Sequence, residues 1–187
     1  MNLEDSKVSD AQRRDFIANV AAKITLGLRR SMSRNGIRQI PDFVNGIVFA
    51  GLLLEKNMPG EGGATFVDSF EKDALRLFET LQGEAFAKDL REIRRHEVGV
   101  TDQSPTEMLV TAGLSAESTI RQITEEQGLD RDEVLEATVG VIVAAIASDP
   151  QAGSDTVKDI VAHIREKTSV WDKIIPSDEE MGLDDFE

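Results

Sequence analysis

The sequence contains no cysteine and no tyrosine, and it holds two histidines and one tryptophan among 187 residues. The absence of cysteine excludes disulfide bonds, thiolate metal ligands and thiol nucleophiles, and it favours a reducing compartment. The small number of histidines leaves few side chains that bind transition metals or exchange protons near neutral pH. Disulfide-stabilised and thiol-dependent classes of protein are therefore excluded at the outset.

Long hydrophobic runs are missing as well. The longest runs, at 44–54 and 137–147, reach about half of the ~20 residues that a membrane-spanning helix needs. The first ten residues, MNLEDSKVSD, are polar and acidic, whereas a secretory signal is basic and then apolar. We therefore expect a soluble, cytoplasmic protein without a transmembrane segment.

Motifs of catalysis and cofactor binding are also missing. There is no Gly-x-Ser-x-Gly elbow, and the glycines at 59–65 lack the Gly-Lys-Ser/Thr ending of a phosphate loop. His96 and His163 each follow a carboxylate by four residues, which is the spacing of a surface pair on a helix and not the Glu-x-x-His of di-iron bundles. We predict no catalytic residue, no metal site and no cofactor.

Signals for helices recur along the whole chain, whereas signals for strands are scarce. Ser9 with Gln12, Ser104 with Glu107 and Asp130 with Glu133 have the spacing of capping boxes. We predict an all-α protein, a compact bundle of about six to eight helices. We expect helices to start near residue 9, at 65 and at 105, and further helices to cover 42–56, 115–127, 130–148 and 154–167. The pattern that starts at 65 suits one long helix or two helices divided at Gly83.

The segment TVGVIVAAIA at 138–147 is ambiguous, because its β-branched residues also suit a buried strand. Its length and its continuity with the capped sequence DRDEVLEA favour a helix. Such a helix is apolar on nearly all sides, so we expect it to lie at the centre of the bundle.

The segment VGVTDQS at 98–104 is the best candidate for a joint within the chain. It would separate an N-terminal helical subdomain at 9–98, with a basic amphipathic first helix, from a C-terminal helical subdomain at 104–168. Residues 169–187 would then form an acidic tail. The two subdomains are expected to pack on one another.

Residues 118–142 have the rhythm of a DNA-binding helix-turn-helix. The turn and the start of the second helix, however, carry Asp130, Asp132, Glu133 and Glu136 against Arg131 alone. Contacts with phosphate groups supply most of the non-specific affinity for DNA, and these carboxylates would repel the backbone. We therefore expect two packed core helices, and we keep a nucleic-acid-binding regulator, using 115–147, as the alternative.

The net charge of −14 is unevenly distributed along the chain. Residues 1–40 carry eight lysines and arginines against four acids, whereas residues 169–187 carry one lysine against seven acids. Acids interleaved with spaced hydrophobic residues are typical of linear motifs that fold into a partner's groove. The predicted partner-binding residues are Arg29, Arg30, Arg34 and Arg38 in the basic head, and Met181, Leu183, Asp184, Asp185 and Phe186 in the tail.

These observations predict a non-enzymatic protein–protein interaction protein, an adaptor, inhibitor or regulator, whose partner is another protein. Its helical surfaces and acidic tail would carry the binding, and self-association of the chain is an additional expectation. Because head and tail have opposite charge, the tail is also predicted to cover the arginines at 29–38. The third alternative for function is a helical enzyme whose site the sequence does not reveal.

Overall fold

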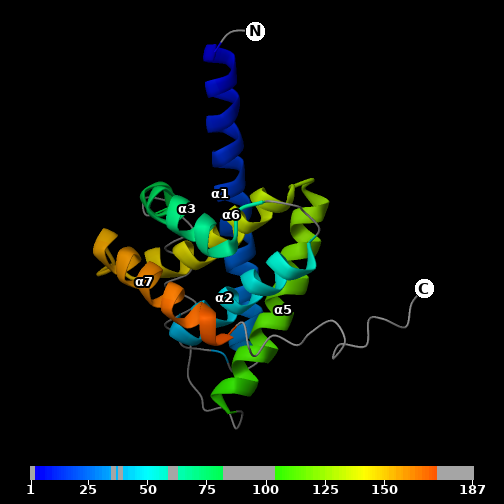
Figure 1. Cartoon of the computed structure of the whole chain (residues 1–187), viewed down its shortest axis with the longest axis vertical. Helices are drawn as coiled ribbons and strands as arrows, with labels where there is room; N and C mark the ends of the chain where they lie inside the picture. The colour runs from blue at the N-terminus through cyan, green and yellow to red at the C-terminus, as the bar shows by residue number, and fades with distance from the viewer. Residues whose placement is uncertain (1–2, 35–36, 38–39, 59–62, 82–103, 172–187) are drawn as a thin grey trace, which may run out of the picture.

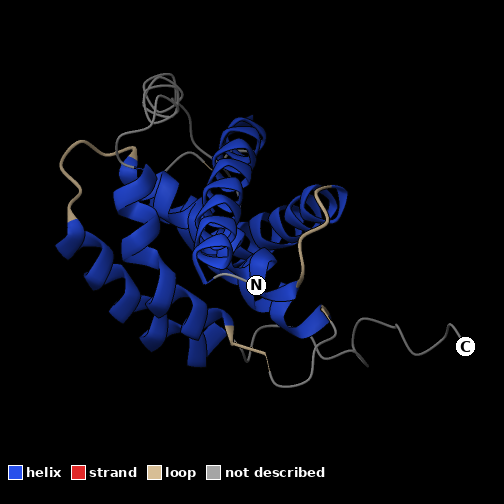
Figure 2. Cartoon of the chain, turned by 90° about the horizontal axis from the view of Figure 1, so that it is seen from above, coloured by secondary structure: helices blue, strands red, loops and turns tan. Residues whose placement is uncertain are grey.

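A computed structural model describes residues 3–34, 37, 40–58, 63–81 and 104–171, and these residues form six α-helices and no strand (Figures 1 and 2). The helices are α1 (Leu3–Arg34), α2 (Ile40–Asn57), α3 (Phe66–Leu81), α5 (Pro105–Glu126), α6 (Arg131–Ala147) and α7 (Ser154–Trp171). The predicted all-α bundle is confirmed. The acidic tail after Trp171 lies outside the described residues.

The helix α6 lies at the centre of the bundle, in contact with α1, α2 and α3. Every residue from Ala137 to Ala147 is buried, and the segment is helical, not extended. Its capping box is present, because the Asp130 side chain accepts from the Glu133 amide and the Glu133 carboxylate accepts from the Asp130 amide. A helix that lacks a polar face must be enclosed on all sides, and the predicted central helix is confirmed.

The helix α1 packs one face against α6. Ile17, Ile24 and Leu28 recur at helical spacing, and each is at most 2% exposed. The backbones approach closely where Ala21 meets Gly140 of α6, since a Cβ added to Gly140 would lie 2.6 Å from the Ala21 Cβ. The predicted amphipathic first helix is therefore docked on the core, while its first turns extend beyond the rest of the bundle in Figure 1.

The helices α2 and α5 form the most extensive helix pair. A Cβ added to Gly46 would lie 2.7 Å from the Ala112 Cβ, and one added to Gly113 would lie 2.3 Å from the Phe49 ring. The two glycines thus let the helix backbones come together more closely than side chains would permit. This pair holds the first turns of α2 and α5 side by side.

A tight turn joins α5 to α6. Gly128 has φ +66°, a left-handed conformation that glycine adopts without the steric cost of a Cβ. The Gly128 amide donates to the Glu125 carbonyl, and the Leu129 amide donates to the Thr124 carbonyl, both at 3.0 Å. These two bonds are those of a Schellman motif, so Gly128 ends α5 by a defined geometry.

Three helix boundaries differ from the predictions. The helix α1 begins at Leu3, before the predicted start at Ser9. The helix α5 runs without interruption from Pro105, whereas a separate helix was expected from 115.

At the other end of the chain, α7 continues through Trp171 instead of ending near Lys167. Val157 and Ile164 are buried, and α7 packs on α3, where an ion pair joins Arg165 to Glu71. This contact joins α7 to the helical core.

Residues from both predicted subdomains contribute to a single hydrophobic core. The helices α1, α2 and α3 precede the expected joint, and each of them packs on α6, which follows it. The segment 98–103 itself lies outside the described residues, so the boundary stays a prediction.

Candidate functional site

A hollow next to the basic head lies between the first turns of α2 and α5, and we call it the α2–α5 groove. Its volume is about 260 Å³, below the roughly 300–1,000 Å³ of typical small-molecule pockets. The lining residues are Ile37, Asp42, Asn45, Pro105, Thr106, Met108 and Leu109. A groove of this size suits one or two side chains of a partner better than a whole cofactor.

The start of α5 is fixed by a capping box that positions the residues of the groove. The Ser104 side chain accepts from the Glu107 amide at 3.3 Å, and the Glu107 carboxylate accepts from the Ser104 amide at 2.8 Å. Pro105 occupies the first helical turn, where its fixed φ suits a helix start. Met108 and Leu109 are therefore presented from a well-defined first turn.

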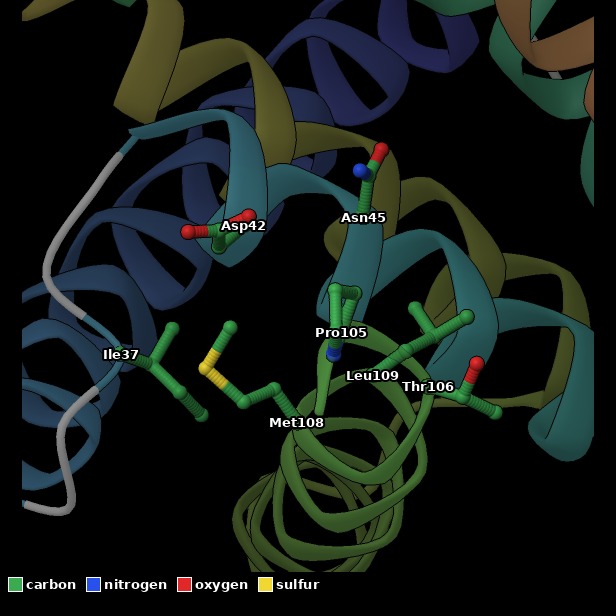
Figure 3. A pocket seen from close by; sticks show the side chains of 7 residues that line it. All are labelled: Ile37, Asp42, Asn45, Pro105, Thr106, Met108 and Leu109. Carbon is green, nitrogen blue, oxygen red and sulfur yellow. The ribbon is translucent and has the colours of Figure 1, made fainter. Parts of the chain in front are cut away.

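The opposite wall comes from α2 and from the connection that precedes it. The Ile37 amide donates to the Met32 carbonyl at 2.9 Å, and the Ile37 side chain is 2% exposed. Figure 3 shows the side chains of Ile37 and Met108 extending toward one another across the groove, with Asp42 on the α2 side. The groove thus combines an apolar floor with a carboxylate at its rim.

Among the described residues in the first turns of the two helices at the groove, the charged side chains are acidic. Asp42 stands in the first turn of α2, and Glu107 stands in the first turn of α5. Hydrogen bonds from the Ser104 backbone amide and side chain lower the pKa of Glu107, so this carboxylate is ionised at neutral pH. Because both helix N-termini already face a carboxylate, the groove favours a cation or a hydrogen-bond donor over an anion.

The structure places the predicted arginines of the head in different environments. Arg29 is 1% exposed, and its guanidinium lies 5.1 Å from the centre of the Phe43 ring. A side chain in this position is part of the bundle interior, whereas Arg30 is exposed on the surface of α1. Of the predicted partner-binding residues, the structure describes the side chains of Arg29 and Arg30. The side chains of Arg34 and Arg38, and the tail residues Met181, Leu183, Asp184, Asp185 and Phe186, lie outside the described part of the chain.

The α2–α5 groove was not predicted from the sequence. Its walls come from two segments, 37–45 and 105–109, that are far apart in sequence, so no local spacing reveals it. One local signal was present, because Met108, Leu109 and Val110 are consecutive apolar residues directly after a helix start. A helix with a single buried face cannot bury three consecutive positions completely. In the structure all three residues are half-buried.

The helix-turn-helix-like segment does not present its second helix to solvent. Within α6, the residues from Val134 onward are buried, apart from the half-buried Glu136. The exposed positions around the turn include Glu125, Glu126, Asp130 and Asp132. The geometry therefore does not favour reading of DNA by this segment.

Within the described part of the chain, no group of three or more His, Asp or Glu residues is placed to hold a metal ion. His163 is exposed on α7, and His96 lies outside the described residues. No described helix is both long enough and apolar enough to traverse a bilayer. Comparison of the chain with protein-family models, with curated proteins and with solved structures finds no match.

Proposed function

We propose that this protein is a non-enzymatic interaction protein, an adaptor, inhibitor or regulator, that holds a segment of another protein in the α2–α5 groove. The observation that supports the proposal is the half-buried apolar floor of Met108 and Leu109 beside the carboxylate of Asp42. Half-buried apolar side chains next to a polar rim are the usual anatomy of a protein–protein contact.

The partner segment would carry a large apolar residue next to a lysine or an arginine. The apolar side chain would lie against Met108 and Leu109, where the flexible thioether of Met108 adapts to its shape. The cation would approach Asp42 at the rim. Burial of one large apolar side chain contributes about 1.5–3 kcal/mol, whereas an exposed ion pair contributes about 0.2–1 kcal/mol, so the apolar anchor dominates affinity and the charge mainly selects the partner.

A peptide array tests this proposal. Peptides that pair Leu, Met or Phe with Lys or Arg are screened against the full chain, and the best binder is titrated by calorimetry. We expect Leu109→Glu to weaken binding at least about tenfold, equivalent to about 1.4 kcal/mol. We expect Asp42→Asn to weaken it about two- to fivefold, within the range of an exposed ion pair.

Two matched variants control for general effects of charge and stability. Leu114→Glu introduces the same carboxylate on α5 at a leucine that is 48% exposed and outside the groove. Asp155→Asn removes an exposed carboxylate from the first turn of another helix, α7. Both controls should bind as the natural protein does. Equal loss of binding in Leu109→Glu and Leu114→Glu, or no binding by any apolar–basic peptide, would contradict the proposal.

A further inference from the structure

A second cavity lies where the C-terminal ends of α2 and α7 meet the start of α3, and we call it the α2–α7 cavity. Its volume is about 350 Å³. Leu52 and Val67 supply apolar surface, and Lys56 and Arg165 supply positive charge. The other lining residues are Glu55, Thr65 and Thr168.

The charged lining distinguishes this cavity from two other hollows in the described part of the chain. The α2–α5 groove has Asp42 as its charged lining residue, and a hollow between the start of α2 and the α6–α7 connection has Asp149. The α2–α7 cavity is lined by two cations and one carboxylate. In a chain with a net charge of −14, it is the hollow best suited to an acidic segment.

The carboxylates around this cavity already have partners. Glu55 accepts from the Phe66 amide at 2.8 Å and so caps α3. Asp68 accepts from the Thr65 amide at 3.2 Å, and its own amide donates to the Thr65 hydroxyl. Glu71 pairs with Arg165, whose side chain is still 68% exposed. Lys56 is also exposed at this rim, so an incoming carboxylate would share Arg165 and Lys56 with the groups that these cations already contact.

The acidic tail starts next to this cavity. Thr168 lines it, and α7 ends three residues later at Trp171. The following residues, 172–187, carry seven acids against one lysine and include Met181, Leu183 and Phe186. Ten residues of extended chain span at most about 33–36 Å, so these hydrophobic residues can reach a cavity that lies one helical turn from the tail's root.

We propose that residues 177–187 dock in the α2–α7 cavity of their own chain, with hydrophobic side chains against Leu52 and Val67 and carboxylates beside Lys56 and Arg165. This assignment differs from the expectation that the tail covers the arginines at 29–38, of which Arg29 is 1% exposed. A short linker gives an effective concentration in the millimolar range, so a contact that is weak between separate molecules is populated within one chain.

Amide chemical shifts of the ¹⁵N-labelled full chain test this inference in both directions. The double substitution Leu183→Ser with Phe186→Ser should shift the amides of Val67 and Thr168, which are at least fifteen positions away in sequence. The reverse experiment reads the tail: Lys56→Glu with Arg165→Glu should shift the tail amides toward those of a free peptide 177–187.

The matched control reverses the charge of Lys72 and Lys158, two exposed lysines on α3 and α7 that do not line the cavity. This control should leave the tail amides unchanged. The inference would be overturned if the amide shifts of Val67 and Thr168 were the same in the Leu183→Ser, Phe186→Ser variant as in the natural protein. It would also be overturned if reversing the charges of Lys72 and Lys158 shifted the tail amides as much as reversing those of Lys56 and Arg165. If the amide shifts that report the contact are lost when the protein is diluted tenfold, the tail binds another copy of the chain, and the assignment to the same chain is wrong.

Discussion

The neighbouring helices α5 and α6 have opposite relations to solvent. They are joined by a turn of four residues, 127–130, and both start with a complete capping box. The helix α6 is buried on all sides from Ala137 to Ala147, whereas α5 buries one face and leaves Leu114 48% exposed. Equally well-defined helix starts therefore serve different roles: α6 is the core on which the bundle folds, and α5 presents a surface.

The largest expected effect is the loss of a buried side chain from α6. Ile142 is fully buried, so Ile142→Ala should lower the free energy of unfolding by about 2–5 kcal/mol through lost burial and the cavity that it leaves. Leu114→Ala on α5 should change it by no more than about 0.5 kcal/mol. Urea denaturation followed by circular dichroism measures both, and similar costs for the two variants would remove the distinction between these helices.

A smaller effect is expected where α6 meets α1. In Gly140→Ala the new Cβ would lie 2.6 Å from the Ala21 Cβ, so the helices must separate, at a cost of about 1–3 kcal/mol. The control is Gly27→Ala on α1, where no atom lies within 4 Å of the added Cβ. That control should stabilise the protein by about 0.5–1 kcal/mol, since alanine favours a helix interior. Stabilisation by both substitutions would contradict the observed close approach.

The core of the fold could be predicted because its signals are local. The apolar run at 137–147 exceeds what one buried face requires, and Asp130 with Glu133 marks the start of its helix. The α5 start at Ser104 and Pro105 was visible for the same reason. Capping and periodicity depend on residues three or four positions apart, so they can be identified without knowledge of the tertiary structure.

The candidate sites could not be predicted in this way. The α2–α5 groove combines side chains from two segments and the α2–α7 cavity from three, and only packing brings those segments together. The burial of Arg29 did have a local signal. Ala21, Thr25 and Arg29 follow one another at four-residue spacing and share one helix face, and the Thr25 hydroxyl donates to the Ala21 carbonyl at 2.7 Å within the core. The cluster of arginines nevertheless suggested a solvated surface.

The smallest expected effect concerns the ion pair that links α1 to the first turn of α6. Arg13 donates to both carboxylate oxygens of Glu133, and this contact, opposed by partial burial, lowers the pKa of Glu133. A carboxylate whose pKa is lower in the folded state stabilises the protein above its unfolded-state pKa, and this contribution is lost as the pH falls through the folded-state value. Arg13→Gln should therefore lower the melting temperature near neutral pH by less than either core substitution does.

The same variant should approach the natural protein in melting temperature as the solution is made more acidic, because Glu133 becomes protonated in both. Arg14→Gln is the matched control, since Arg14 is the next residue on α1 and is also exposed; its effect should not depend on the protonation of Glu133. Differential scanning calorimetry of the three proteins across the acidic range measures this. If the difference in melting temperature between Arg13→Gln and the natural protein stays constant with pH, the charge of Glu133 contributes nothing to the α1–α6 contact. The arginine would then act through its contacts with Phe16 or with the Gly128 carbonyl.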